Sequence, residues 1–270
     1  MIRRAVVAGT FYAGGERALR RQVEDLLHTV EERIGGVGVV VPHAGYLYSG
    51  QVAGAVYARL AAPECCVILG PNHTGLGAGA AIMTWGTWET PLGELIIDTE
   101  LARAISDQSQ VLEEDDRAHR KEHSIEVQLP FLQVLFPEIP FVPICLLSHE
   151  YGVCRDVGYA VAKAIQASGK RVLLVASTDL SHYVSQEMAE RKDRMVIEAM
   201  LDLDPERLYA TVLQERISMC GFHPTTAMLI AAKMLGASRA ELIRYGTSGE
   251  VTKDYSSVVG YAGMNILGTS

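Results

Sequence analysis

The sequence contains no long apolar run. None of its segments approaches the about 18 uninterrupted apolar residues that a membrane-spanning helix needs, so we expect no membrane partner. The N-terminal stretch MIRRAVVAGTFYAGG has an arginine pair, but its apolar run is short and gives way to charged residues, which makes it a weak candidate for a signal peptide. The sequence is therefore not typical of a membrane-embedded or an exported protein.

The cysteine patterns typical of disulfide frameworks and zinc ribbons are missing. The five cysteines make an odd number and form no C-x-x-C pair. Cys65 and Cys66 are neighbours inside an apolar run, where thiols usually pack as small hydrophobic groups. This usage is typical of a reducing compartment, so we expect a cytoplasmic protein.

Clusters of positive charge are also missing. The 24 Lys and Arg residues are outnumbered by 32 Asp and Glu residues, and no basic stripe is available to neutralise phosphates, so we expect no nucleic-acid partner. Neither the G-x-x-x-x-G-K-[ST] phosphate loop nor the G-x-S-x-G serine elbow occurs. Residues 75–80, GLGAGA, fit the dinucleotide pattern G-x-G-x-x-A, but a strand-like run follows where a phosphate-binding helix should begin.

The sequence does contain a regular alternation of helical and strand-like segments. It shows no linker, repeat or low-complexity tract, so we expect a single α/β domain over residues 1–270. Alternating strands and helices predict a mostly parallel, mixed sheet flanked by helices on both faces. The expected helices are 16–34, 49–60, 123–136, 152–166, 188–201, 204–216 and 224–235. The expected strands are 37–41, 65–69, 80–85 with 90–97 around a Pro-Gly turn, 141–147, 171–177, 240–246 and 256–264.

Histidines follow three of the expected strands. His43 comes after VGVVVP, His73 after VILGPN, and Asp179 and His182 come after VLLVAS. In open parallel sheets, ligands bind outside the carboxyl ends of the strands, because the loops from several strands meet there. One loop histidine is ordinary, but the repetition predicts a shared site at this edge.

Imidazoles gathered with one anionic group favour a transition-metal site. His43 and His73 supply the imidazoles, and the anionic ligand is either Cys220 or Glu122. Cys220 is the stronger candidate because it precedes an expected helix, so both the positive helix end and the metal would stabilise its thiolate. The alternative for Cys220 is a buried structural thiol.

A second pair of polar residues lies in KEHSIEVQLPFL. His123 and Glu126 share one face of the expected helix, but their H-x-x-E spacing is not the H-E-x-x-H of zinc proteases. A surface pair, or a pair that supports ligating imidazoles through hydrogen bonds, is the more ordinary interpretation. The sequence leaves the roles of Glu122, His123 and Glu126 open.

Asp179 and His182 predict a pair for proton transfer. The spacing lets the carboxylate accept a hydrogen bond from one imidazole nitrogen, fix the tautomer and leave the other nitrogen facing the open position of a metal. The alternative is that Asp179 caps the next helix.

Several collinear motifs then point to a family. PHAGYLYSG, LGPNHTG, TPLGELIID, EHSIEVQLPFL, STDLSHY, CGFHPTTAM and YGTSGE followed by SSVVGYAGM occur in this order over nearly the whole chain. The set resembles the Memo family (mediator of ErbB2-driven cell motility), whose prokaryotic members are called AmmeMemoRadiSam system protein B. One departure is at residues 11–13, FYA, where the family usually has FYP. The resemblance implies His43, His73 and Cys220 as metal ligands, with Asp179 and His182 lining the same pocket.

The resemblance also implies a fold similar to the class III extradiol dioxygenases, which are non-haem iron enzymes. Those enzymes use two histidines and a carboxylate, whereas this chain offers two histidines and a softer thiolate, which admits iron, copper or zinc. Our first hypothesis is therefore a metal-dependent oxidoreductase, with iron as the leading metal and an unidentified substrate. The alternatives are a zinc-type metallohydrolase and a non-catalytic, metal-containing module that binds a small molecule or a peptide. The family further implies a radical-SAM protein and an AMMECR1-like protein as system partners.

Overall fold

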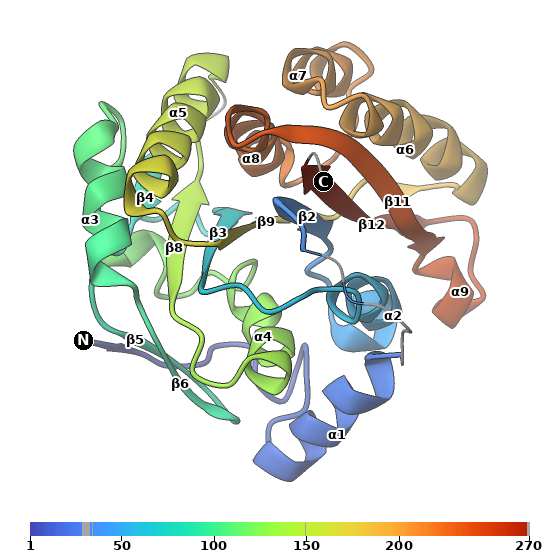
Figure 1. The fold of residues 1–270 in the computed structure, drawn as a ribbon. Helices are drawn as coiled ribbons and strands as arrows, with labels where there is room; N and C mark the ends of the chain where they lie inside the picture. The colour runs from blue at the N-terminus through green and yellow to red at the C-terminus, as the bar shows by residue number, and fades with distance from the viewer. Residues whose placement is uncertain (29–32, 34, 149, 269–270) are drawn as a thin grey trace.

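The computed structural model describes residues 1–28, 33, 35–148 and 150–268. Their centre is a nine-stranded mixed sheet with the order β10-β12-β2-β9-β3-β8-β4-β7, and β11 pairs with β12 (Figure 1). Strands β2, β9, β3 and β8 are parallel to one another, and β12 and β4 run antiparallel on either side of them. The strands are β2 (Gly38–Val41), β3 (Cys65–Pro71), β4 (Ala80–Ile82), β7 (Glu113–Glu114), β8 (Phe141–Leu146), β9 (Val172–Ser177), β10 (His182–Val184), β11 (Ala237–Thr247) and β12 (Val258–Gly268).

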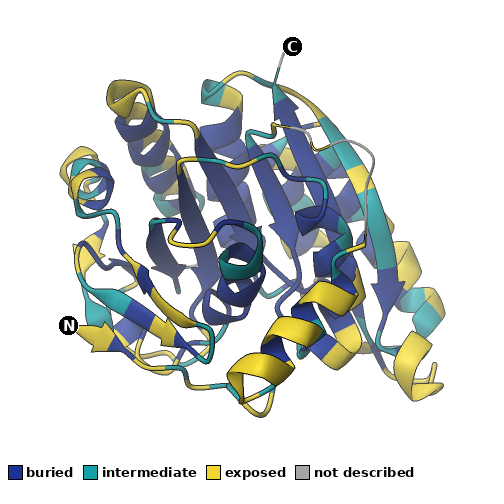
Figure 2. Ribbon diagram, turned by 60° about the horizontal axis from the view of Figure 1, so that its bottom comes forward, coloured by how far each residue is buried: buried dark blue, intermediate teal, exposed yellow. Residues whose placement is uncertain are grey.

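The four parallel strands form the core because both of their faces are covered. All residues of β2, β3, β8 and β9 are buried, as expected for apolar, β-branched runs in a covered parallel sheet (Figure 2). Cys65 and Cys66 are fully buried in β3, and burial raises the pKa of both thiols. The predicted packing of these two cysteines as core residues is confirmed.

Helices cover both faces of the sheet. On one face α8 packs against β2, β3 and β9 and is flanked by α5 and α7, while α1, α2 and α4 lie on the other face (Figure 1). The predicted α/β class, a mixed and mostly parallel sheet between helical layers, is therefore confirmed. The helices are α1 (Glu16–Leu26), α2 (Tyr46–Tyr57), α3 (Thr99–Gln108), α4 (Leu129–Leu135), α5 (Tyr151–Ser168), α6 (Gln186–Leu201), α7 (Pro205–Gln214), α8 (Phe222–Met234) and α9 (Gly249–Thr252).

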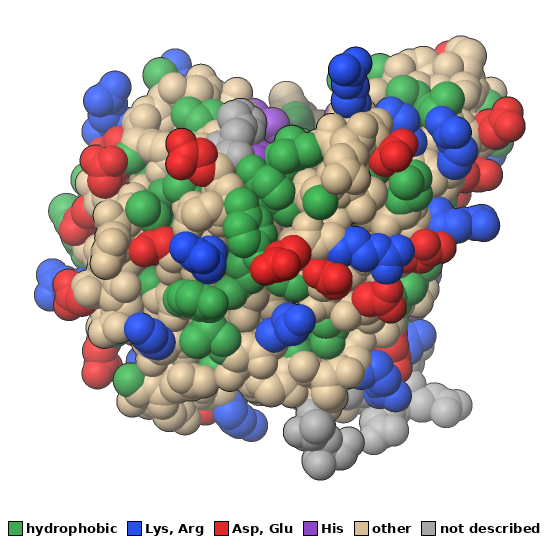
Figure 3. Space-filling view, turned by 90° about the horizontal axis from the view of Figure 1, so that it is seen from above, with side chains coloured by type: hydrophobic (Ala, Val, Ile, Leu, Met, Phe, Trp, Pro, Cys, Tyr) green, Lys and Arg blue, Asp and Glu red, His purple; other side chains and the backbone are tan. Residues whose placement is uncertain are grey.

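A small second sheet carries the N-terminus. It has the order β1-β5-β6, with β1 (Ile2–Arg3) parallel to β5 (Thr87–Thr90), and β5 antiparallel to β6 (Gly93–Ile96). The first residues of the chain thus pair with a segment more than eighty residues away. Among the described residues, no helix is both long and apolar enough to cross a bilayer. Figure 3 shows one face of the molecule, on which acidic and basic side chains are intermixed.

Two predicted helices differ from the structure, and some of the observed elements were not predicted. The helix expected over 16–34 ends at Leu26, where it packs closely on α2: a Cβ at Gly54 would lie 2.2 Å from the carbonyl oxygen of Leu26. Residues 29–32 and 34 lie outside the described part of the chain. The helix expected over 123–136 is a 3-10 turn, η2 (Glu126–Gln128), followed by α4. Helix α3 was not predicted, although Asp98 caps it and Leu101, Ala102 and Ile105 recur at helical spacing.

Candidate metal centre

Three adjacent strands bring polar side chains to one edge of the sheet. β9 lies between β2 and β3, and all three are parallel, so the residues just after them meet at the carboxyl edge. His43 follows β2, His73 follows β3, and Asp179 follows β9. The rings of His43 and His73 have centroids 5.1 Å apart, so the structure brings these two predicted ligands together.

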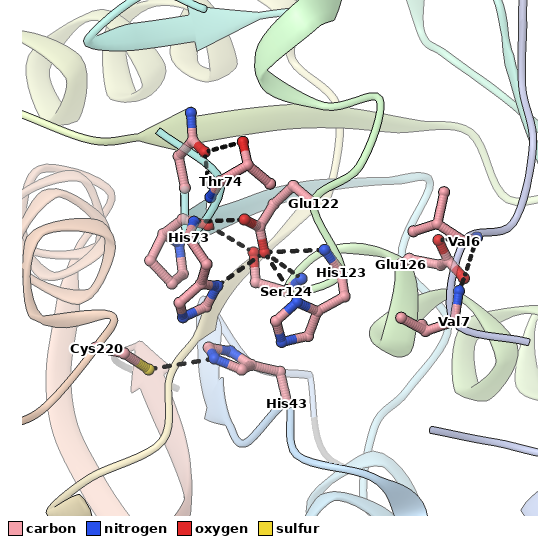
Figure 4. A network of polar contacts seen from close by, with 12 residues as sticks. Val6, Val7, His43, His73, Thr74, Glu122, His123, Ser124, Glu126 and Cys220 are labelled. Carbon is pink, nitrogen blue, oxygen red and sulfur yellow. Dashed lines mark hydrogen bonds and ion pairs between the residues drawn. The ribbon is translucent and has the colours of Figure 1, made fainter. Parts of the chain in front are cut away.

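A third imidazole completes the cluster. One ring nitrogen from each of His43, His73 and His123 lies within 4.8 Å of the others (Figure 4). The rings of His73 and His123 stack with centroids 4.8 Å apart, and the rings of His43 and His123 are 5.5 Å apart. This spacing allows the three imidazoles to bind one metal ion. Their donor atoms fit a transition metal, because neutral imidazoles suit zinc, copper and iron.

The carboxylate of Glu122 accepts hydrogen bonds from two of these histidines. This fully buried group accepts hydrogen bonds from His73 Nδ1 (2.9 Å), from the backbone N–H of His73, and from the N–H groups of His123 and Ser124 (2.9 Å each). Burial works to raise the pKa of Glu122, but the hydrogen bond from His73 and the other donors outweigh it and lower this pKa to about 2. Since Nδ1 of His73 is held as a donor, Nε2 is the nitrogen left for a metal.

His43 is fixed in a similar way. Its Nδ1 lies 2.9 Å from Ser177 Oγ, and its backbone N–H donates to Asp179 Oδ1 (2.8 Å). Its Nε2 lies 3.2 Å from the sulfur of Cys220. Burial, followed by the neighbouring imidazoles of His123, His73 and His182, lowers the pKa of His43. This shift favours the neutral imidazole, which is the form that binds metals.

Cys220 sits where the sequence predicts, directly before α8. Gly221 lets this turn approach β9 closely, because a Cβ there would lie 2.4 Å from the carbonyl oxygen of Ser177. The sulfur of Cys220 accepts from the backbone N–H of Asp179 (3.3 Å), and burial raises the pKa of the thiol. The structure thus places the thiol beside His43, next to the imidazole cluster.

Asp179 and His182 share the predicted edge but contact other groups than predicted. Among the described residues, no hydrogen bond joins them: Asp179 accepts from His43, whereas His182 Nδ1 lies 2.7 Å from Leu180 O and 2.8 Å from Ser218 O. Since both partners are carbonyl oxygens, His182 Nδ1 must donate, so backbone groups fix its tautomer and leave Nε2 as the acceptor. The alternative that Asp179 caps the next helix is wrong, because β10 follows and Ser185 caps α6.

The predicted helical pairing of His123 with Glu126 is also wrong. His123 precedes η2 and faces the other two histidines, whereas Glu126 points away to the N-terminal segment (Figure 4). Gly70 in β3 makes room for Ser124, the residue after His123, because a Cβ at Gly70 would lie 2.5 Å from Ser124 Oγ. Because the H-x-x-E spacing suggested a helix, His123 was not predicted to lie beside His43 and His73. The signal that was available is its position beside Glu122, since a carboxylate next to an imidazole is a common support for metal ligands.

Known proteins match this chain over nearly its whole length. The sequence model of the Memo family, described as Memo-like protein, matches residues 3–265. A MEMO1 family protein of Methanopyrus kandleri is 45% identical over 98% of this chain and 98% of its own length. A MEMO1 family protein of Methanococcoides burtonii is 46% identical over 97% of this chain and 99% of its own.

The fold is also similar to a solved structure. An uncharacterized protein from Escherichia coli K12 matches with a TM-score of 0.56, covering 84% of this chain and 98% of the other. The sequence identity is 15%, so this likeness shows the fold alone.

Proposed function

We propose the function of this chain from one premise, which is that it belongs to the family of Memo-like proteins. The function is to hold one transition-metal ion at the carboxyl edge of the sheet and to act there as a metal-dependent oxidoreductase. The observation that carries the proposal is the convergence of His43, His73 and His123 within 4.8 Å, with the Cys220 sulfur 3.2 Å from His43.

The donor set fits a metal in its chemistry as well as its position. His43 and His73 would present Nε2, because Ser177 and Glu122 occupy their Nδ1 atoms. Cys220 would supply the anionic ligand, since metal binding favours loss of the thiol proton in spite of burial. His123 is either a fourth donor or a polar group beside a bound ligand. A bound iron or copper ion would supply electron transfer at this site, whereas zinc would supply Lewis acidity only.

The protein residues around the metal position have separate tasks. Glu122 and Ser177 orient the ligating imidazoles, and Asp179 holds the backbone of the loop that carries His43. His182, with Nδ1 fixed as a donor, keeps Nε2 free to accept a proton from a bound substrate or water. This arrangement supports proton transfer beside the metal without a carboxylate partner for His182.

The experiment that tests this function is anaerobic purification without added metal, followed by elemental analysis and by spectroscopy before and after exposure to oxygen. We expect about one equivalent of iron or copper per chain and a spectrum that changes with oxygen. A zinc-loaded protein that is silent under oxygen would favour the hydrolase instead. A protein that keeps its ligand binding after complete metal removal would contradict both enzyme hypotheses and favour a binding module.

We expect His182→Ala to keep its metal but to lose proton transfer. Nδ1 of His182 contacts only backbone carbonyls among the described residues, so metal content and melting temperature should stay near those of the wild type. Turnover, or binding of azide at the metal as followed by absorbance, should fall by about 100-fold or more. Unchanged azide binding and activity in the folded variant would show that His182 is not the proton carrier.

A further inference from the structure

The N-terminal segment, residues 3–12, is anchored beside the metal centre by one buried carboxylate. Glu126 is fully buried and accepts hydrogen bonds from the backbone N–H groups of Val6 (2.9 Å) and Val7 (3.1 Å) and from the Tyr12 hydroxyl (2.5 Å). Arg3 forms an ion pair with the same carboxylate. Figure 4 shows Glu126 facing Val6 and Val7 on the side away from the histidines. These contacts all fix the N-terminal segment in one position.

Arg3 ties the same segment to the residues that lead into the site. Its Nε donates to the carbonyl of His119 (3.1 Å) and its Nη2 donates to the carbonyl of Glu122. The guanidinium also lies over the ring of Trp88, 4.3 Å from its centroid. Arg3 therefore holds both ends of segment 119–122, whose last residue orients His73.

The far end of the N-terminal segment reaches the imidazole cluster. The ring of Phe11 packs against His123 with centroids 4.7 Å apart. The carbonyl of Phe11 accepts from the backbone N–H of Tyr46 (2.7 Å), which begins α2 three residues after His43. Phe11 thus bridges His123 and the loop that carries His43.

We propose that Glu126 is a positioning residue of the metal centre: by fixing residues 3–12, it places Phe11 against His123 and so holds this imidazole toward His43 and His73. A buried carboxylate that served packing alone would be a costly choice, because an apolar group of similar size avoids the desolvation of a charge. Several donors converging on one carboxylate instead specify a single geometry. The inference rests on the proposed metal function, but the contact between Phe11 and His123 does not require a metal.

The test compares Glu126→Gln with Asp98→Asn. The first substitution would leave Arg3 without a counter-charge and would replace one acceptor oxygen by an amide nitrogen that cannot accept. Asp98 is the matched control, because its carboxylate also accepts a backbone N–H (Leu101, 3.0 Å) and pairs with a cation (Lys170, 2.8 Å), but beside the amino-terminal ends of β8 and β9. Both substitutions remove a charge-assisted hydrogen-bond network, but only Glu126 is connected to the imidazole cluster through the N-terminal segment.

Two readouts separate positioning from simple stability. In metal-free protein with labelled histidines, Glu126→Gln should shift the His123 ring signals in the NMR spectrum as Phe11→Ala does, because both remove the ring current of Phe11. In metal-loaded protein, a chelator should extract the ion about 10- to 100-fold faster than from the wild type, the range expected for loss of a group that supports metal ligands. Asp98→Asn should change neither quantity. The double variant Phe11→Ala, Glu126→Gln should release metal no faster than the worse single variant, since both act through one contact.

Unchanged His123 signals in folded Glu126→Gln would overturn the proposal, and so would an equal effect of Asp98→Asn. Should Glu126→Gln fail to fold, Tyr12→Phe removes one donor from the same carboxylate and is judged by the same signals. If the wild type bound no metal, the proposed function would fail, whereas the His123 signals would still decide whether Glu126 positions this imidazole.

Discussion

Cys220→Ser is expected to lower metal affinity more than any other single substitution at the site. The serine hydroxyl stays neutral near pH 7, so the variant offers no anion to the metal, whereas the wild-type thiol can lose its proton on binding. The loss should exceed the about 10- to 100-fold that removal of a supporting group costs. The loss for His123→Gln should fall within or below that range, because His43, His73 and the Cys220 sulfur would remain as donors. Competition with a chromophoric chelator measures both affinities.

The control for this series is His28→Ala. His28 is exposed and pairs with Gln51, away from the cluster, so its loss removes an imidazole without touching the site. The variant His43→Ala, His73→Ala should retain no metal at all. If Cys220→Ser binds as tightly as the wild type while His123→Gln does not, the three imidazoles form the site and Cys220 is a neighbouring thiol.

The location of the site could be predicted from the sequence because it depends on where the parallel strands end. Short β-branched runs such as VGVVV and CCVIL identify the buried parallel strands, and parallel strands end at a common edge. His43 and His73 needed no further information, since each follows its strand within three residues. Cys220 was predicted from its place before a helix. The structure brings these three residues together, although their role as ligands stays a prediction.

The parts that could not be predicted depend on contacts distant in sequence. His123 and Glu126 are three residues apart, a helical spacing, but the chain forms only a turn before η2, so the two side chains diverge. Glu126 instead contacts the N-terminal segment, where Arg3 and Tyr12 bind its carboxylate from 123 and 114 positions away. Periodicity within a window contains no information about such a partner. The same limit applies to Asp179, whose acceptor role toward His43 spans 136 residues.

Glu122→Gln is expected to weaken both the fold and the metal centre. Four donors converge on this carboxylate: the imidazole and backbone N–H of His73, and the backbone N–H groups of His123 and Ser124. Glutamine keeps the shape but turns one acceptor oxygen into a donor, so at least one buried N–H loses its partner and faces an amide hydrogen. An unsatisfied buried group of this kind costs about 1–3 kcal/mol, which denaturant unfolding of metal-free protein should show.

The effect on the metal follows from the tautomer of His73. With the carboxylate in place, Nδ1 of His73 carries the proton and Nε2 is free to bind. A glutamine oxygen in the place of Oε1 is a neutral and weaker acceptor, so it holds this tautomer and the orientation of the ring less firmly. We expect metal affinity to fall by about 10- to 100-fold. Glu64→Gln, which removes an exposed carboxylate paired with Arg171, should change neither stability nor affinity measurably. A Glu122→Gln protein that loses stability yet binds metal as the wild type does would show that Glu122 supports only the backbone, and His73 would then be oriented by its strand alone.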